Sequence, residues 1–179
     1  MDTSSKQSVA VLFCDIVGTS KLVASEGDLV VANLLRAFFE NAGRLAAEHH
    51  CAFLKFIGDA FLAAFDSADQ VLPFASAVVS VTESDPIIRD HHLGLRFTLH
   101  FGDVLCIETS YGKDILGEDI NIAGRLNDLA AAGQIVISDV ALQRLPVSQQ
   151  QGVGPIETAS IRRAGDIRFR RLRLAASKG

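Results

Sequence analysis

The sequence lacks a strong net charge, a long apolar run and a secretion signal, the features that would indicate a nucleic-acid-binding, membrane or secreted protein. The net charge is only −4, and the one basic cluster, at 168–173, alternates with apolar residues as a half-solvated strand does. Nucleic-acid binding needs clustered Lys and Arg on a surface. No apolar run approaches the roughly 18 residues of a membrane helix, and Met1–Ser8 lacks the apolar core of a secretion signal. We expect a cytoplasmic protein without nucleic-acid or membrane partners.

Cysteine is also scarce. The three cysteines, Cys14, Cys51 and Cys106, are odd in number and have neither CxxC nor Cys/His spacing. They predict buried free thiols in a reducing compartment. By contrast, hydrophobic residues make up 49% of the chain, enough for one sizeable core. We expect a polar segment at 1–8, one domain at 9–174 and a short tail at 175–179.

The order of the apolar segments predicts an α+β fold. Strands are expected at Val9–Ile16, Ala52–Ile57, Ala60–Phe65, Leu95–Phe101, Gln134–Ser138 and Ile167–Leu174. Helices are expected at about Leu29–Glu48, Ala68–Val81 and Glu118–Ala131, and Asp139 is expected to cap a short helix. Gly102 is expected to interrupt its strand. This order favours a ferredoxin-like or palm-like antiparallel sheet with helices on one face, a fold that hosts many functions.

Two acidic residues stand beside apolar strands. Asp15 ends a buried run, and Asp59 occupies a two-residue Gly-Asp hairpin turn. Ionised carboxylates beside a core are costly unless they are compensated, and Mg²⁺ prefers oxygen ligands supplied by one or two carboxylates and substrate phosphates. The pair therefore suggests a cation site. The alternative is that both are ordinary turn residues, since Asp is common at such positions.

Two further pairs of polar residues are candidates for a functional site. Asn121 and Arg125 lie four residues apart, so they share one helix face, and a guanidinium there suits a phosphoryl group. A plain solvated helix face explains them as well. Lys55 interrupts an apolar strand just before the Gly-Asp turn, while Asp114 follows a polar turn. The alternative for Lys55 is a lysine on an edge strand, where its charge discourages pairing with the sheet of another molecule. The alternative for Asp114 is an ordinary turn residue.

Five motifs in order resemble class III adenylyl and guanylyl cyclase catalytic domains. The opening FCDIVGTS and the hairpin KFIGDAF contain the two acidic residues, and LRFTLHFGDV is similar to the family's R-x-G-x-H-x-G-x-V strand. DILGEDINIAGRL matches the D-x-x-G-x-x-x-N-x-A-x-R helix entry, and a strand like QIVIS follows it. The resemblance covers about Val9–Leu145. Each motif alone is weak, but the joint spacing is specific.

The resemblance implies a lyase that makes 3′,5′-cyclic AMP and pyrophosphate for signal transduction. Asp15, Asp59 and the Ile16 carbonyl would hold two Mg²⁺ or Mn²⁺ ions, as in two-metal phosphoryl chemistry. Asn121 would orient the ribose and Arg125 would stabilise charge on the α-phosphate. Arg96, Lys55 and Asp114 would bind substrate. Arg96 would contact phosphate, Lys55 would donate to adenine N1, and Asp114 would accept from the adenine amino group.

The chain departs from the family pattern at two places. Thr98 replaces the glycine two residues before the family histidine, His100. The phosphate-binding lysine near the C-terminus is missing, and Arg162, Arg163 or Arg168 could replace it.

In the family the site is composite, with metal residues from one subunit and base, ribose and transition-state residues from the other. This chain has both sets, so the resemblance implies a homodimer with ATP as substrate. The alternatives are a catalytically silent nucleotide-binding module, or a cyclase for GTP or a pyrimidine triphosphate. A diguanylate cyclase would need GG[DE]EF where this chain has FIGDAF. A regulatory partner or domain is expected outside this sequence.

Overall fold

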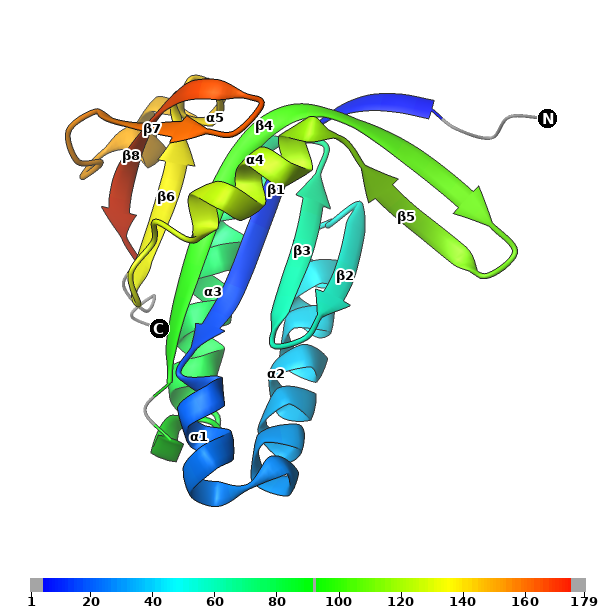
Figure 1. Cartoon of the computed structure of the whole chain (residues 1–179), viewed down its shortest axis with the longest axis vertical. Coiled ribbons are helices and arrows are strands. Elements are labelled where there is room, and N and C mark those ends of the chain that lie inside the picture. The colour runs from blue at the N-terminus through cyan, green and yellow to red at the C-terminus, as the bar shows by residue number, and fades with distance from the viewer. Residues whose placement is uncertain (1–4, 92, 175–179) are drawn as a thin grey trace.

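A sheet of eight strands runs through the computed structural model, which describes residues 5–91 and 93–174 (Figure 1). Its order is β2-β3-β1-β4-β6-β8-β7, and β5 pairs with the far part of β4 in a ribbon that projects from the body. All pairs are antiparallel except β4 with β6. The strands are β1 (Ser5–Val17), β2 (Phe53–Ile57), β3 (Ala60–Phe65), β4 (Gly94–Thr109), β5 (Gly112–Leu116), β6 (Gln134–Ser138), β7 (Glu157–Ile161) and β8 (Gly165–Arg173).

Helices cover both faces of the sheet, with α2 and α3 behind it and α4 in front (Figure 1). Alternate residues of a strand face opposite sides; on β1, Leu12 joins the α2/α3 core whereas Val11 packs in a cluster with Ala123 of α4. The helices are α1 (Thr19–Glu26), α2 (Asp28–Glu48), α3 (Val71–Ser84), α4 (Glu118–Asn127) and α5 (Asp139–Leu142), with short 3-10 turns η1 (Ala68–Gln70), η2 (Arg89–His91) and η3 (Val147–Gln150). The α+β fold class is confirmed. The expectation that the helices lie on one face is wrong, and one pair of the otherwise antiparallel sheet, β4 with β6, is parallel.

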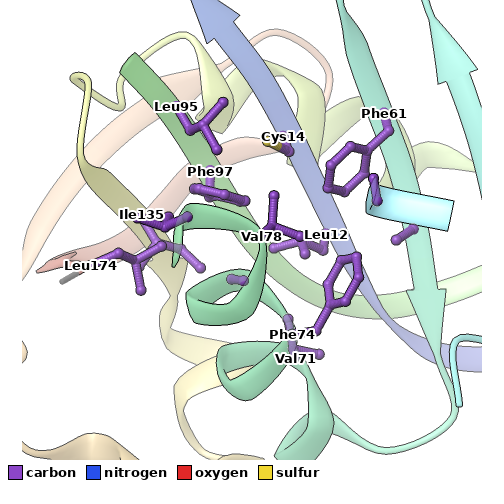
Figure 2. Close-up of a cluster of buried hydrophobic side chains, with 14 of the residues drawn as sticks. Leu12, Cys14, Phe61, Val71, Phe74, Val78, Leu95, Phe97, Ile135 and Leu174 are labelled. Carbon is purple, nitrogen blue, oxygen red and sulfur yellow. The ribbon is translucent and has the colours of Figure 1, made fainter. Parts of the chain in front are cut away.

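The larger core lies between the sheet and helices α2 and α3. Figure 2 shows Phe61, Phe74 and Phe97 interleaved there with Leu12 and Cys14, all of them fully buried. Burial raises the pKa of the Cys14 thiol well above its usual range, so this cysteine is a packing residue. The other two cysteines are free but only half-buried, so the expectation of buried thiols is right for Cys14 alone.

Several element boundaries differ from the sequence expectations. β4 runs unbroken through Gly102, because hydrogen bonds to β1 continue on both sides of it. α4 ends at Asn127, four residues before the expected end at Ala131, and Leu129 beyond it is exposed. The cap of α5 is Ser138, whose Oγ accepts from the Ala141 N–H, and Asp139 is the first helical residue.

Three elements were not expected at all: α1, β5 and β7. β1 also begins at Ser5, inside the segment predicted to precede the domain. Residues 1–4 and 175–179 lie outside the described part, so the proposed domain division stays a prediction. Among the helices at 5–91 and 93–174, none has both the length and the apolar character needed to cross a membrane.

Candidate functional site

Asp15 and Asp59 lie on adjoining backbone at one end of the sheet. Asp15 stands opposite Ala60 in the β1–β3 register, and Asp59 immediately precedes β3. The Ile16 N–H donates to the Asp59 carbonyl oxygen at 3.4 Å. The turn depends on Gly58, whose φ of 61° lies in the left-handed region. The two predicted metal-binding residues are therefore neighbours in space, although 44 positions separate them in the sequence.

Each of these carboxylates already has a polar partner in the chain. Arg96 lies directly across from Asp15 on β4, and its Nε and Nη2 approach Asp15 Oδ2 at 2.6 and 2.5 Å. The Thr19 hydroxyl, at the start of α1, donates to Asp59 Oδ2. Arg96 Nη2 also lies 4.0 Å from Asp128 Oδ1. Arg96 therefore compensates the charge of Asp15, so a cation at Asp15 would share or replace this partner.

The candidate ligands are of the chemical type that a hard divalent cation prefers, but they are few in number. Asp15, Asp59 and the Ile16 carbonyl offer only oxygen ligands, which Mg²⁺ and Mn²⁺ prefer. No cluster of three or more His, Cys, Asp or Glu side chains with metal-binding geometry occurs at 5–91 and 93–174. Such a site is complete only when water or substrate oxygens fill the remaining positions, as is usual for Mg²⁺ beside phosphates.

Lys55 and Asp114 form a second ion pair on the same face of the sheet. Lys55 on β2 reaches Asp114 on β5, with Nζ and Oδ2 2.5 Å apart, and the Ile115 N–H donates to Asp114 Oδ1 at 2.8 Å. The hydrogen bond from Lys55 lowers the pKa of Asp114. β2 is indeed an edge strand, as the alternative interpretation requires. The two side chains nevertheless meet, so they act as one unit.

Asn121 and Arg125 are exposed on α4 and line a cleft of about 590 Å³. This volume is in the range of small-ligand sites. The opposite wall is the β7–β8 turn, which brings Arg162 and Arg163 into the cleft. Arg168 instead pairs with Asp139, its Nη2 lying 2.7 Å from Oδ2. Of the three arginines considered as phosphate ligands, only the first two therefore share a cleft with Arg125.

The predicted site residues thus do not line one common cleft in a single chain. The cleft with Asn121 and Arg125 is lined by neither Asp15 nor Asp59, and Lys55 is absent from its walls. Sequence reasoning missed Thr19, although it lies inside the quoted FCDIVGTS motif. A small polar residue after a glycine was the available signal, since Gly18 at φ 108° starts α1 and turns Thr19 toward the hairpin.

Comparison with known proteins gives a consistent result. The model of the adenylate and guanylate cyclase catalytic domain matches residues 1–167. A germination-specific adenylate cyclase of Dictyostelium discoideum is 32% identical over 149 residues, 74% of this chain and 17% of that protein. An adenylate cyclase of Streptomyces griseus is 25% identical over 94% of this chain and 40% of its own length. The chain therefore spans well under half of these relatives.

The fold has solved counterparts as well. The catalytic core of a rhodopsin-guanylyl cyclase with converted specificity, solved in complex with ATPαS, superposes with a TM-score of 0.83. The two chains are 20% identical, and the match covers 96% of this chain and 98% of that one. At this identity the likeness establishes the fold alone.

Proposed function

Because this chain belongs to the adenylate and guanylate cyclase catalytic domain family, we propose that it converts ATP to 3′,5′-cyclic AMP and pyrophosphate in a homodimer. The observation that carries the proposal is the Lys55–Asp114 pair. It presents a cationic donor and an ionised acceptor side by side.

The choice of adenine rests on hydrogen-bond complementarity. Adenine N1 is an acceptor and suits the Lys55 ammonium, while the exocyclic amino group is a donor and suits the Asp114 carboxylate. Guanine presents the opposite pattern at these atoms. The lowered pKa keeps Asp114 ionised and able to accept. A mismatched base would leave charged groups unpaired, which makes such discrimination steep.

The chemistry is an in-line displacement at the α-phosphorus. The ribose 3′-hydroxyl loses its proton to solvent and its oxygen forms a bond to the α-phosphorus, while the bond from that phosphorus to the bridging β-phosphate oxygen breaks and pyrophosphate leaves with the electron pair. Divalent ions held by Asp15, Asp59 and the Ile16 carbonyl would lower the pKa of the 3′-hydroxyl and neutralise the leaving group. Arg125 donates to the α-phosphate oxygens as charge builds there, and Asn121 holds the ribose.

The other arginines would bind the remaining phosphates. Arg96 exchanges its partner Asp15 for phosphate oxygens when a cation occupies Asp15. Arg162 and Arg163 take the place of the missing family lysine, since they line the cleft that contains Arg125. Planar guanidinium groups suit phosphate oxygens well.

The proposal places two copies of the chain at each site, because the candidate residues do not line one cleft within a single copy. Asp15, Asp59 and Arg96 would meet Lys55, Asp114, Asn121 and Arg125 of a second copy, which gives two equivalent sites about a two-fold axis. Mixing Asp15→Ala with Arg125→Ala protein tests this directly. Half of the dimers would be hybrids with one intact site of two, so we expect about a quarter of the wild-type activity. No recovery after verified subunit exchange contradicts the shared site.

One observation favours a second candidate, a catalytically silent nucleotide-binding module. Arg96 already compensates Asp15 and thereby weakens its attraction for cations. A product assay with each of the four nucleoside triphosphates and Mn²⁺ or Mg²⁺ separates the candidates, with Asp59→Ala as control. Metal-dependent cyclic AMP formation supports the proposal, and ATP binding without product supports the silent module. Preferential turnover of GTP or a pyrimidine triphosphate would contradict the base assignment.

Regulation of the proposed activity is expected from outside this sequence. The chain corresponds to 17% and 40% of two adenylate cyclase relatives, which therefore contain much additional sequence. We propose that a partner or a further domain controls the distance between the two copies. A cytoplasmic location remains part of this proposal.

A further inference from the structure

A buried histidine holds the beginning of α4 against β4. The side chain of His100 is 4% exposed, and its Nε2 lies 3.0 Å from Asp119 Oδ1 in the first turn of α4. The other oxygen of the same carboxylate accepts from the Asp103 N–H at 2.7 Å. A Cβ at Gly102 would lie 2.1 Å from Asp119 Cγ, so the glycine is what allows this close approach.

The same histidine is tied to the neighbouring strand. His100 Nδ1 lies 2.8 Å from Ser138 Oγ, and Ser138 Oγ accepts from the Ala141 N–H. A single tautomer satisfies every atom: Nε2–H donates to Asp119, and Nδ1 accepts the Ser138 hydroxyl proton. Ser138 is completely buried, so this Ser-His-Asp row is closed to any substrate and serves no nucleophilic reaction.

The far end of α4 has a second anchor on the same strand face. Thr98 is fully buried two residues before His100, and its hydroxyl donates to Asn127 Oδ1 at 3.2 Å. Asn127 is the last residue of α4 and is also buried. Thr98 and His100 therefore fasten the two ends of the helix to β4. Thr98 stands where the family pattern has a glycine, which has no hydroxyl and could not make this hydrogen bond.

The catalytic candidates lie between the two anchors. Asn121 follows Asp119 by two positions, and Arg125 precedes Asn127 by two. Neither side chain has a hydrogen bond or ion pair with the part of the chain that the structure describes, so their positions depend on where α4 sits. The apolar contacts of α4 are non-directional, whereas buried hydrogen bonds fix one arrangement.

We propose that Thr98 and His100 are positioning residues that hold α4 in the register at which Asn121 and Arg125 act. This proposal rests on the cyclase function proposed above. Transition-state stabilisation falls steeply when a donor is displaced by as little as 1 Å. A loosened α4 is therefore expected to lower kcat while the Lys55–Asp114 pair, on other elements, keeps KM nearly constant.

The test uses Thr98→Val, which keeps the shape and removes the hydroxyl. We expect kcat to fall about tenfold, with KM within about twofold. Thr98→Ser, which restores a hydroxyl, should recover most of the loss. Thr82→Val is the matched control, because Thr82 is also a buried threonine and lies on α3, on the other face of the sheet. It should leave kcat unchanged.

A second measurement is independent of catalysis. Amide hydrogen exchange at 118–127 should accelerate in Thr98→Val and remain at the wild-type rate in Thr98→Ser, while exchange in β6 stays unchanged in both. Wild-type protein that makes no cyclic nucleotide would refute the proposed cyclase function. The hydrogen-exchange measurement would still test whether Thr98 holds the end of α4.

Two outcomes overturn the positioning role. One is Thr98→Val with kcat within twofold of wild type and unchanged exchange in α4. The other is an equal loss of kcat in Thr98→Val and Thr82→Val, which would indicate general destabilisation. His100→Leu extends the test to the first anchor if the protein folds, with His100→Gln, which keeps a donor, expected to lose less activity.

Discussion

The two faces of the central sheet differ in what they contain. The face toward α2 and α3 is lined by apolar side chains such as Leu12, Phe61 and Phe97. The face toward α4 has the charged residues Asp15 and Arg96 and the buried polar residue His100. Neighbouring residues on a strand point to opposite faces. One residue can therefore contribute to the apolar core while the next contributes to the proposed active site. Around the Asp15–Arg96 pair, core packing and proposed catalysis are thus separated by one residue along β1 and β4, whereas Val9 and Val11, farther back on β1, pack in an apolar cluster with Ala123 of α4.

The separation has a physical basis. A dry apolar layer tolerates no unpaired charge, whereas the α4 face accommodates Asp15 and Arg96 because the two side chains compensate each other. Arg96 and Phe97 illustrate this: the first pairs with Asp15, and the second is completely buried beside it in the sequence. Substitutions on the two faces should therefore change different measured quantities.

The largest expected effect follows Asp59→Ala on the α4 face. Removing one of the two carboxylates proposed to hold metal should lower cyclic AMP formation about 10³-fold, since metal stabilisation amounts to several kcal/mol. The melting temperature should change by only a few degrees, because Asp59 lies at a hairpin turn. Product formation and thermal unfolding measured on the same preparation check this. An active Asp59→Ala protein would contradict the metal assignment.

The converse substitution, Phe97→Ala, lies on the apolar face of β4. Deleting a fully buried phenylalanine should reduce the free energy of unfolding by about 3–5 kcal/mol. The fraction that remains folded should keep the wild-type kcat. Urea unfolding measures the first quantity, and activity per folded molecule measures the second. A large loss of kcat in fully folded Phe97→Ala protein would show that the two faces are coupled.

The sequence predicts the apolar face better than the polar one. The apolar run in β1 and the helical spacing in α2 identify most of the core, because burial leaves a periodic pattern. α1 was missed because only Thr19 and Leu22 of its eight residues are buried. β7 was missed because only Ile161, its last residue, is buried, so the strand shows little pattern.

The polar face is only partly predictable, because its partners are distant in sequence. The two metal-holding candidates were identified from the motif, but the ion pair between Asp15 and Arg96 joins strands 81 residues apart. No local pattern predicts that pairing. The proposal that Arg162 and Arg163, and not Arg168, bind phosphate likewise depends on the β7–β8 turn, which forms only in the folded sheet.

A third change tests the specificity of the polar face. The double substitution Lys55→Glu with Asp114→Ala should reduce kcat/KM for ATP about 10²-fold, because the adenine edge then faces an acceptor and loses its other partner. Mn²⁺ affinity, measured without nucleotide, should stay unchanged. The control is Lys113→Glu, which alters a neighbouring lysine outside the pair. Equal losses of ATP use and Mn²⁺ binding would mean that the pair is structural.

The smallest expected effect concerns the pKa of Asp114. Its folded-state pKa lies below the ordinary value because Lys55 donates to it. The stabilisation from the pair is therefore present above the ordinary carboxyl pKa and is lost as the pH falls through the lowered, folded-state value. In Lys55→Met, the Asp114 pKa measured by carboxyl NMR should return toward the ordinary value. The half-exposed pair should change unfolding at neutral pH by only about 1 kcal/mol or less. An unaltered pKa would show that Asp114 is held by its backbone contact with Ile115, and that the polar face is organised without Lys55.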